Sequence, residues 1–174
     1  MTSNFAEFDP NIESLGSVSD FVNEFIDAVG PQALFDGFSR EETALLTGYM
    51  ECYGVPRDSL VLREGDEGSF LAILVTGRAI IIKSFEGVEK VVHDLQPGEM
   101  IGEMSLVDGQ RRFASCVTTE PSDFAVLTHE NLYALMDAHP RLGNKLLLML
   151  LGLTTNRLRQ STSFMLPGLL DNLA

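Results

Sequence analysis

The chain is poor in basic residues. Only 12 lysines and arginines stand against 25 aspartates and glutamates in 174 residues, which gives a formal net charge of −13 at pH 7. Proteins that hold a nucleic-acid backbone usually display a basic face, because neutralising the phosphates supplies much of their affinity. The composition therefore disfavours nucleic acid as a partner.

Cysteine and histidine are also scarce. Cys52 and Cys116 are too few and too widely spaced for a disulfide scaffold or a metal knuckle, which predicts two reduced thiols in the core. The three histidines, His93, His129 and His139, lack the His-x-His and His-x-x-x-His spacings of barrel metal enzymes. We therefore expect no metal and no cofactor.

A catalytic nucleophile is not visible either, because neither Ser105 nor Ser115 has a histidine near it in the sequence. A histidine from a distant part of the chain could still lie beside either serine in the folded protein. We expect a protein that is not an enzyme.

Long apolar runs are missing, although 45% of the residues are hydrophobic, so no segment is long enough to cross a bilayer. The first nine residues lack the basic stretch and apolar block of a secretory signal. These absences predict a soluble, cytoplasmic protein with no membrane partner. The length is that of about one domain with enough residues to bury a core.

The N-terminal part is predicted to be helical after a flexible arm over residues 1–16, which show no clear period. From Ser17, apolar residues recur at helical spacing: Val18, Phe21, Val22, Phe25, Ile26 and Val29. This helix ends at Gly30-Pro31, and residues 31–38 form a short helix or turn. Ser39 with Glu42 is a capping box that opens a helix to about Tyr53. Residues 17–58 are thus assigned to N-terminal helices.

From Ser59 the hydrophobic period changes to two. Runs rich in aliphatic and β-branched residues, separated mostly by glycine turns, predict strands over 60–62, 70–76, 78–83, 89–95, 112–119 and 123–128. Repeated short strands of this kind indicate a closed or nearly closed sheet. We predict a jelly-roll-like β-barrel over residues 59–128.

The last third is predicted to be helical over residues 129–162, with a short helix at 130–138, a long one from Leu142 to about Gln160, and a tail over 163–174. Leucines cover more than one face of the long helix. It should therefore bury one side on the barrel and another on the N-terminal helix or on a second subunit. The predicted fold class is α+β, a barrel flanked by N-terminal helices and a long C-terminal helix.

The residue types in one segment of the barrel, residues 98–115, predict an anion-binding site. Gly102 lets a ligand oxygen approach the backbone, and residues 103–107 suffice for one helical turn whose unsatisfied amides favour a negative ligand. Arg112 can fork onto two phosphate oxygens. Glu103 would repel a phosphate but could accept a hydrogen bond from a sugar hydroxyl. The combination predicts a nucleotide.

These residues resemble the phosphate-binding cassette of the cyclic nucleotide-binding domain family, the sensor module of catabolite activator proteins, protein kinase A regulatory subunits and cyclic-nucleotide-gated channels. The family pattern, Gly-Glu-aliphatic-Ala/Ser-Leu and then Arg-small-Ala, is met by Gly102-Glu103-Met104-Ser105-Leu106 and Arg112-Phe113-Ala114. The resemblance implies that Glu103 holds the ribose 2′-hydroxyl, that Arg112 holds the cyclic phosphate and that helix amides supply the rest.

The chain departs from the family pattern at Phe113, where Ala, Ser or Thr is usual. A hydroxyl contact to the ligand is lost there. Ser115 could act as a substitute donor, but on a strand its side chain should point to the face opposite that of Ala114. Within the family, a threonine at this place accompanies guanine preference, so the resemblance favours cyclic AMP while leaving other cyclic mononucleotides open. The rival interpretation is a degenerate domain in which Phe113 fills the phosphate pocket and the helices serve only protein contacts.

The resemblance also implies that the long helix covers the base and can pair two copies into a homodimer. Thr154 and Arg157 offer polar groups that could contact a purine. The family's transcription factors continue into a helix-turn-helix, for which the residues after Ser161 are too few. We therefore expect a bacterial type of regulatory sensor domain that signals to an unknown downstream protein by rearranging its helices.

Overall fold

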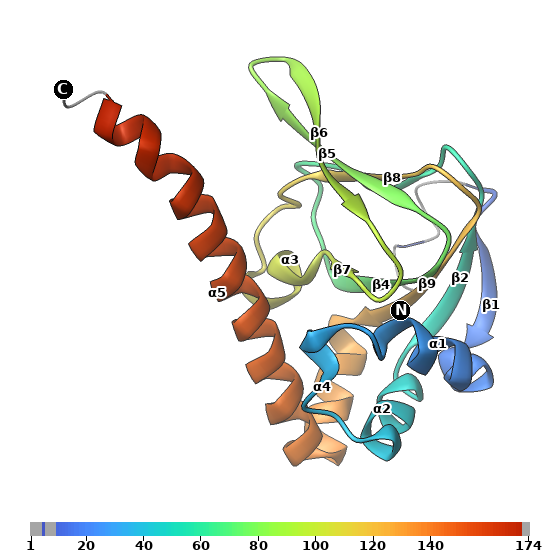
Figure 1. The fold of residues 1–174 in the computed structure, drawn as a ribbon. Coiled ribbons are helices and arrows are strands. Elements are labelled where there is room, and N and C mark those ends of the chain that lie inside the picture. Colours follow the sequence, from blue (N-terminus) through green and yellow to red (C-terminus); the bar gives the residue numbers. More distant parts are fainter. Residues whose placement is uncertain (1–4, 6–9, 172–174) are drawn as a thin grey trace.

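The computed structural model describes Phe5 and residues 10–171, with side chains described as far as Thr162 (Figure 1). Two antiparallel sheets face each other. The first contains, in spatial order, β1 (Glu13–Ser17), β2 (Glu51–Val55), β9 (Ser122–Thr128), β4 (Phe70–Thr76) and β7 (Met100–Ile101). The second contains β3 (Leu60–Leu62), β8 (Ser115–Thr118), β5 (Ala79–Phe85) and β6 (Val88–Leu95). Strands that are distant in sequence pair with each other, such as β2 with β9 and β3 with β8. This arrangement confirms the predicted jelly-roll-like barrel.

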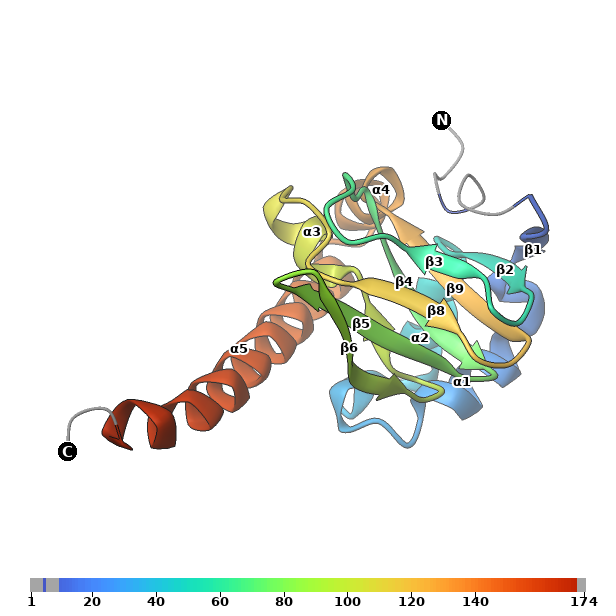
Figure 2. The ribbon, with the colours of Figure 1, turned by 90° about the horizontal axis from the view of Figure 1, so that it is seen from above.

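Most of the helices gather at one end of the barrel, whereas residues 103–108 form a helix beside β7 and the C-terminal helix runs from that end past the barrel (Figures 1 and 2). Their bounds are η2 (Val18–Phe21), α1 (Val22–Val29), η3 (Ala33–Phe35), α2 (Arg40–Thr47), α3 (Glu103–Asp108), α4 (His129–Ala138) and α5 (Pro140–Asp171). The predicted capping box is present, because Ser39 accepts from the Glu42 amide and the Glu42 carboxylate accepts from the Ser39 amide. The α+β class is confirmed.

Strand β4 separates the two parts of the core. Its residues Phe70 to Val75 are all buried, as expected for a strand covered on both faces. Leu71, Ile73 and Val75 pack with the helices, whereas Phe70, Ala72 and Leu74 pack inside the barrel. The alternation of the strand therefore assigns one set of side chains to each cluster.

The boundary predicted between helices and barrel is wrong. The helix that begins after Ser39 ends at Thr47, and Glu51–Val55 forms β2 and pairs with β9. The predicted loose arm is also wrong in part, because Glu13–Ser17 forms β1 against β2 and Phe5 is completely buried. Strand β1 is largely exposed and is held by backbone pairing along one edge, which leaves no alternating apolar pattern in its sequence.

Helix α5 is longer than predicted. It runs from Pro140 to Asp171, across most of the segment assigned to a tail, and residues 172–174 lie outside the described residues. Leu146 and Leu150 are buried on the domain, but the later half of the helix extends away from the barrel in both views (Figures 1 and 2). Within the described residues, no helix is both long and apolar enough to cross a bilayer.

Both thiols should be unreactive in the folded protein. Cys52 and Cys116 are buried and unpaired, and burial raises the pKa of Cys52 to about 11 and that of Cys116 to about 12. Because the thiolate is the reactive form, a disulfide reagent at about pH 8 should label neither cysteine in native protein and both after unfolding in urea. Rapid labelling of either thiol without denaturant would contradict this burial.

Candidate functional site

The predicted anion segment folds around two glycines with left-handed backbone. Strand β7 ends at Ile101, and Gly102 follows it with a φ of +76° and turns the chain into α3. Gly109, with a φ of +67°, is the C-cap of that helix. The loop before β4 lies beside the segment, because the Arg112 amide donates to the Asp66 carbonyl at 2.8 Å. The two loops thus enclose the Arg112 side chain.

Arg112 is the central feature of this enclosure. Its residue surface is only 3% exposed, and its Nη1 donates to the carbonyls of Phe70 at 2.8 Å and Gly102 at 3.0 Å. The guanidinium carbon lies 4.3 Å from the centroid of the Phe70 ring. In the described part of the chain, Nε and Nη2 are buried and have no hydrogen-bond partner. Leaving charged donors in this state is costly unless an anion completes them.

Two glycines make room for the guanidinium. A Cβ at Gly68 would lie 2.4 Å from the Arg112 Nε, and one at Gly102 would lie 2.5 Å from Nη1. Any larger residue at these positions would displace the side chain. The sequence places Gly102 in the predicted site but gives no sign of the role of Gly68, because nothing local to Gly68 reveals its long-range contact with Arg112.

The charge of Arg112 survives its burial. Desolvation lowers the pKa of Arg112 to about 10, and the negative charge of Glu103 opposes the shift. Arg112 therefore remains a cation at neutral pH in a place that water does not reach. An arginine of this kind offers two directed donors and a weakly screened charge to a phosphate.

Glu103 connects the segment to the long C-terminal helix. Its side chain is 1% exposed, and its Oε1 accepts a hydrogen bond from Nη1 of Arg157 on α5. The Nη2 of Arg157 donates to the Met100 carbonyl at 3.0 Å. Arg157 thus ties α5 to both β7 and α3. The Oε2 of Glu103 lies outside this ion pair.

The other polar residue predicted on α5 is engaged within its own helix. The hydroxyl of Thr154 donates to the carbonyls of Leu150 and Leu151. Of the two residues proposed for a base contact, the structure therefore brings Arg157 to the segment through Glu103 and leaves Thr154 on the helix backbone.

Phe113 does not fill the space beside Arg112. It is 60% exposed, and the Lys83 ammonium lies 4.3 Å from its ring centroid. Lys83 also donates to the Phe113 carbonyl and to Glu64, each at 2.6 Å. The ring is thereby held at the rim of the site.

The remaining predicted residues divide between the interior and the surface. Ser105 is buried, Met104 is exposed, and Ala114 is half-buried. Ser115, considered as a substitute donor, instead accepts from the Glu64 amide at 2.9 Å. Its hydroxyl oxygen is therefore engaged by the backbone of the loop that follows β3.

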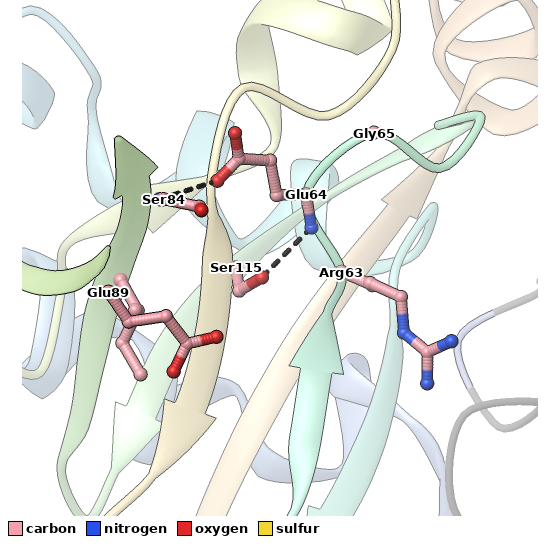
Figure 3. A pocket seen from close by; sticks show the side chains of 7 residues that line it. Arg63, Glu64, Gly65, Ser84, Glu89 and Ser115 are labelled. Atoms are coloured by element: carbon pink, nitrogen blue, oxygen red, sulfur yellow. Dashed lines mark hydrogen bonds between the residues drawn. The ribbon is translucent and has the colours of Figure 1, made fainter. Parts of the chain in front are cut away.

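An open pocket of about 420 Å³ lies near this segment on the outer side of the second sheet (Figure 3). It is lined by Arg63, Glu64, Gly65, Ile82, Ser84, Glu89 and Ser115. None of the residues predicted to bind a nucleotide lines it, and Arg63 points away from Ser84 and Glu89 in Figure 3. In the described residues, no group of three or more potential metal ligands lies close together.

Comparison with known proteins supports the interpretation of the segment. The family model for the cyclic nucleotide-binding domain matches residues 54–139, which include the whole of it. The cyclic AMP receptor protein of Thermus thermophilus is 31% identical over 129 residues, or 74% of this chain and 58% of that protein. A cAMP-dependent protein kinase regulatory subunit of Mycosarcoma maydis is 32% identical over 94 residues, or 54% of this chain and 18% of that protein. The chain spans only part of the length of these curated relatives.

A solved structure extends the likeness to almost the entire chain. It is a cyclic nucleotide-binding domain from Methylobacillus flagellatus KT, 40% identical, with a TM-score of 0.84 and with 97% of this chain and 96% of that one covered. The Thermus thermophilus catabolite activator protein superposes with a TM-score of 0.68 at 30% identity, covering 76% of this chain and 61% of that one. The first of these domains matches this chain in sequence as well as in fold, so the chain belongs to the cyclic nucleotide-binding domain family.

Proposed function

We propose that the chain binds a 3′,5′-cyclic mononucleotide non-covalently and acts as a sensor rather than as an enzyme. The observation that carries this proposal is the buried Arg112 guanidinium, two of whose nitrogens have no partner in the described part of the chain. A cyclic phosphate supplies the oxygens that would satisfy them. The net charge of −13 does not oppose this, because distant charges are screened over roughly 8 Å at physiological salt.

Glu103 would receive the ribose. Its carboxylate is buried next to Arg112, and Arg157 occupies only one of its two oxygens. A carboxylate has about four acceptor sites, so the remaining oxygen can accept a 2′-hydroxyl while the ion pair persists. Arg157 also offsets the charge of Glu103, which lowers its repulsion of a phosphate held by Arg112.

Cyclic AMP is the ligand we favour. Phe113 stands where a threonine accompanies guanine preference in the family, and its ring carries no hydroxyl. The Thermus thermophilus relative is named as a cyclic AMP receptor, which points to the same ligand class.

Signalling would pass through α5. Arg157 is a direct connection between this helix and the ribose-binding carboxylate, and it also bonds to the Met100 carbonyl. A ligand that fixes Glu103 and Arg112 therefore stabilises the position of α5 that Arg157 can reach. Helix rearrangement then depends on ligand occupancy through a defined ion pair.

The same helix offers a face for a second copy of the chain. Leu148, Leu151 and Leu158 are exposed, and with Thr155 and Thr162 they follow the alternating three- and four-residue spacing of a coiled-coil seam. The seam runs from the half of α5 that packs on its own domain into the half that extends away from it (Figure 1). We infer a homodimer through α5. The downstream partner is a protein in this proposal, because the net charge of −13 disfavours nucleic acid.

A second candidate function is that of a protein-interaction module without a ligand. The observation that favours it is the exposed leucine seam, which offers a contact surface that does not include Arg112 or Glu103. The two functions differ in whether Arg112 has any role beyond the fold.

Calorimetric titration with cyclic AMP separates them. Arg112→Ala should weaken binding by at least ~2 kcal/mol, or roughly thirtyfold, because a charge-assisted pair of hydrogen bonds is lost. Glu103→Ala should weaken it as well, through loss of the ribose contact. Arg63→Ala is the matched control, since Arg63 is an exposed arginine outside residues 98–115, and its binding should equal that of the wild type. Equal affinities in all four proteins would refute the assignment.

Arg157→Met tests the connection to α5. We expect weaker cyclic AMP binding, because Glu103 loses the cation that offsets its charge, and we expect hydrogen exchange along α5 to respond less to ligand. Arg141→Met is the control, an exposed arginine at the start of the same helix. Unchanged affinity and an unchanged exchange response in Arg157→Met would show that this ion pair does not couple ligand binding to α5.

The dimer is tested by sedimentation. Leu151→Asp places a charge in the apolar seam and should shift the protein from dimer towards monomer, while Asn156→Asp, at an exposed position outside the seam, should leave the association unchanged. A wild-type protein that sediments as a monomer at all accessible concentrations would rule out the proposed pairing.

A further inference from the structure

Phe5 contributes an aromatic ring to the interior of the barrel from the N-terminal end of the chain. It is 0% exposed. Its ring centroid lies 5.0 Å from that of Tyr53, 5.2 Å from that of Phe70 and 5.9 Å from that of Phe124. The contact with Phe70 is edge-to-face, a preferred geometry for aromatic pairs. A residue far from residues 98–115 in sequence is thus part of the same core cluster as Phe70.

Phe70 is also the residue that holds Arg112. Its ring lies under the guanidinium at 4.3 Å, and its carbonyl accepts from Nη1 at 2.8 Å. The orientation of this ring therefore affects where Nε and Nη2 point. Because Phe5 packs against the same ring, the contacts form a continuous series from Phe5 through Phe70 to Arg112.

We propose that Phe5 is a positioning residue for the anion site, acting on Arg112 through Phe70. The proposal rests on the proposed function, since it treats Arg112 as the phosphate-binding group. Replacing Phe5 by a smaller residue leaves a gap beside Phe70, and a ring with room to tilt no longer fixes the guanidinium above it. Arg112 then spends part of its time in orientations that do not suit a phosphate.

The coupling works in both directions. If a docked Phe5 favours the binding orientation of Arg112, then a ligand on Arg112 favours the docked state of Phe5 to the same extent. The N-terminal segment would therefore be a second element, besides α5, whose stability depends on ligand. Any interaction that withdraws Phe5 from the barrel would lower the affinity for nucleotide.

The test compares two conservative substitutions in the full chain. Phe5→Leu should weaken cyclic AMP binding roughly fivefold or more, the low end of typical coupling between sites. Phe25→Leu is the matched control, because Phe25 is also 0% exposed but lies in the other core cluster, among the helices. The stability of each variant is measured by unfolding in urea. Phe25→Leu should bind cyclic AMP as tightly as the wild type, even where it loses as much stability as Phe5→Leu. Equal affinity of Phe5→Leu and wild type would overturn the proposal.

A second arm requires no ligand. Unfolding free energies in urea are measured for Phe5→Leu, Arg112→Met and the double variant, and we expect them not to add, whereas Phe25→Leu and Arg112→Met should add. If the wild-type protein binds no cyclic nucleotide, the proposed function fails, and this cycle alone decides the positioning role. Additive free energies for Phe5 and Arg112 would then overturn it too.

Discussion

The structure depends on the burial of one guanidinium whose hydrogen bonds are incomplete. Arg112 keeps its charge in the interior because Phe70 supports its face, two carbonyls accept from Nη1, and Glu103 lies near enough to oppose the fall in its pKa. Two of its nitrogens still lack a partner in the described residues. A fold with no use for an anion there would gain stability by replacing the charge with an apolar side chain. The unfilled donors are the physical reason for regarding this place as a binding site.

The same site is connected to two distant parts of the chain. Arg157 joins α5 to Glu103, and the aromatic contacts of Phe70 join the N-terminal Phe5 to Arg112. Each connection is short and consists of groups in direct contact, so a change at either end alters the arrangement of Arg112 and Glu103. Under the proposed function, ligand binding at these two charges would act on both parts of the chain.

Local patterns in the sequence predicted the local parts of the fold and site. The capping box at Ser39 and the apolar run of β4 depend on neighbours within a few residues, and the spacing from Gly102 to Arg112 lies within one short segment. Features that depend on long-range contact were missed. Strand β1 is an exposed edge strand paired with β2, Gly68 leaves room for the Arg112 side chain, and Phe5 packs against rings from three strands. None of these leaves a periodic signal in the sequence.

The central claim is that a cyclic mononucleotide completes the hydrogen bonding of Arg112. The most direct measurement is the melting temperature of the purified protein against a panel of cyclic and linear nucleotides, repeated with Arg112→Lys. A ligand present at a hundred times its dissociation constant adds about 2.7 kcal/mol of stability. We expect cyclic AMP to raise the wild-type melting temperature accordingly and to have much less effect on Arg112→Lys, which keeps the charge but loses the fork. A panel in which no cyclic mononucleotide shifts the wild-type melting temperature would contradict the account.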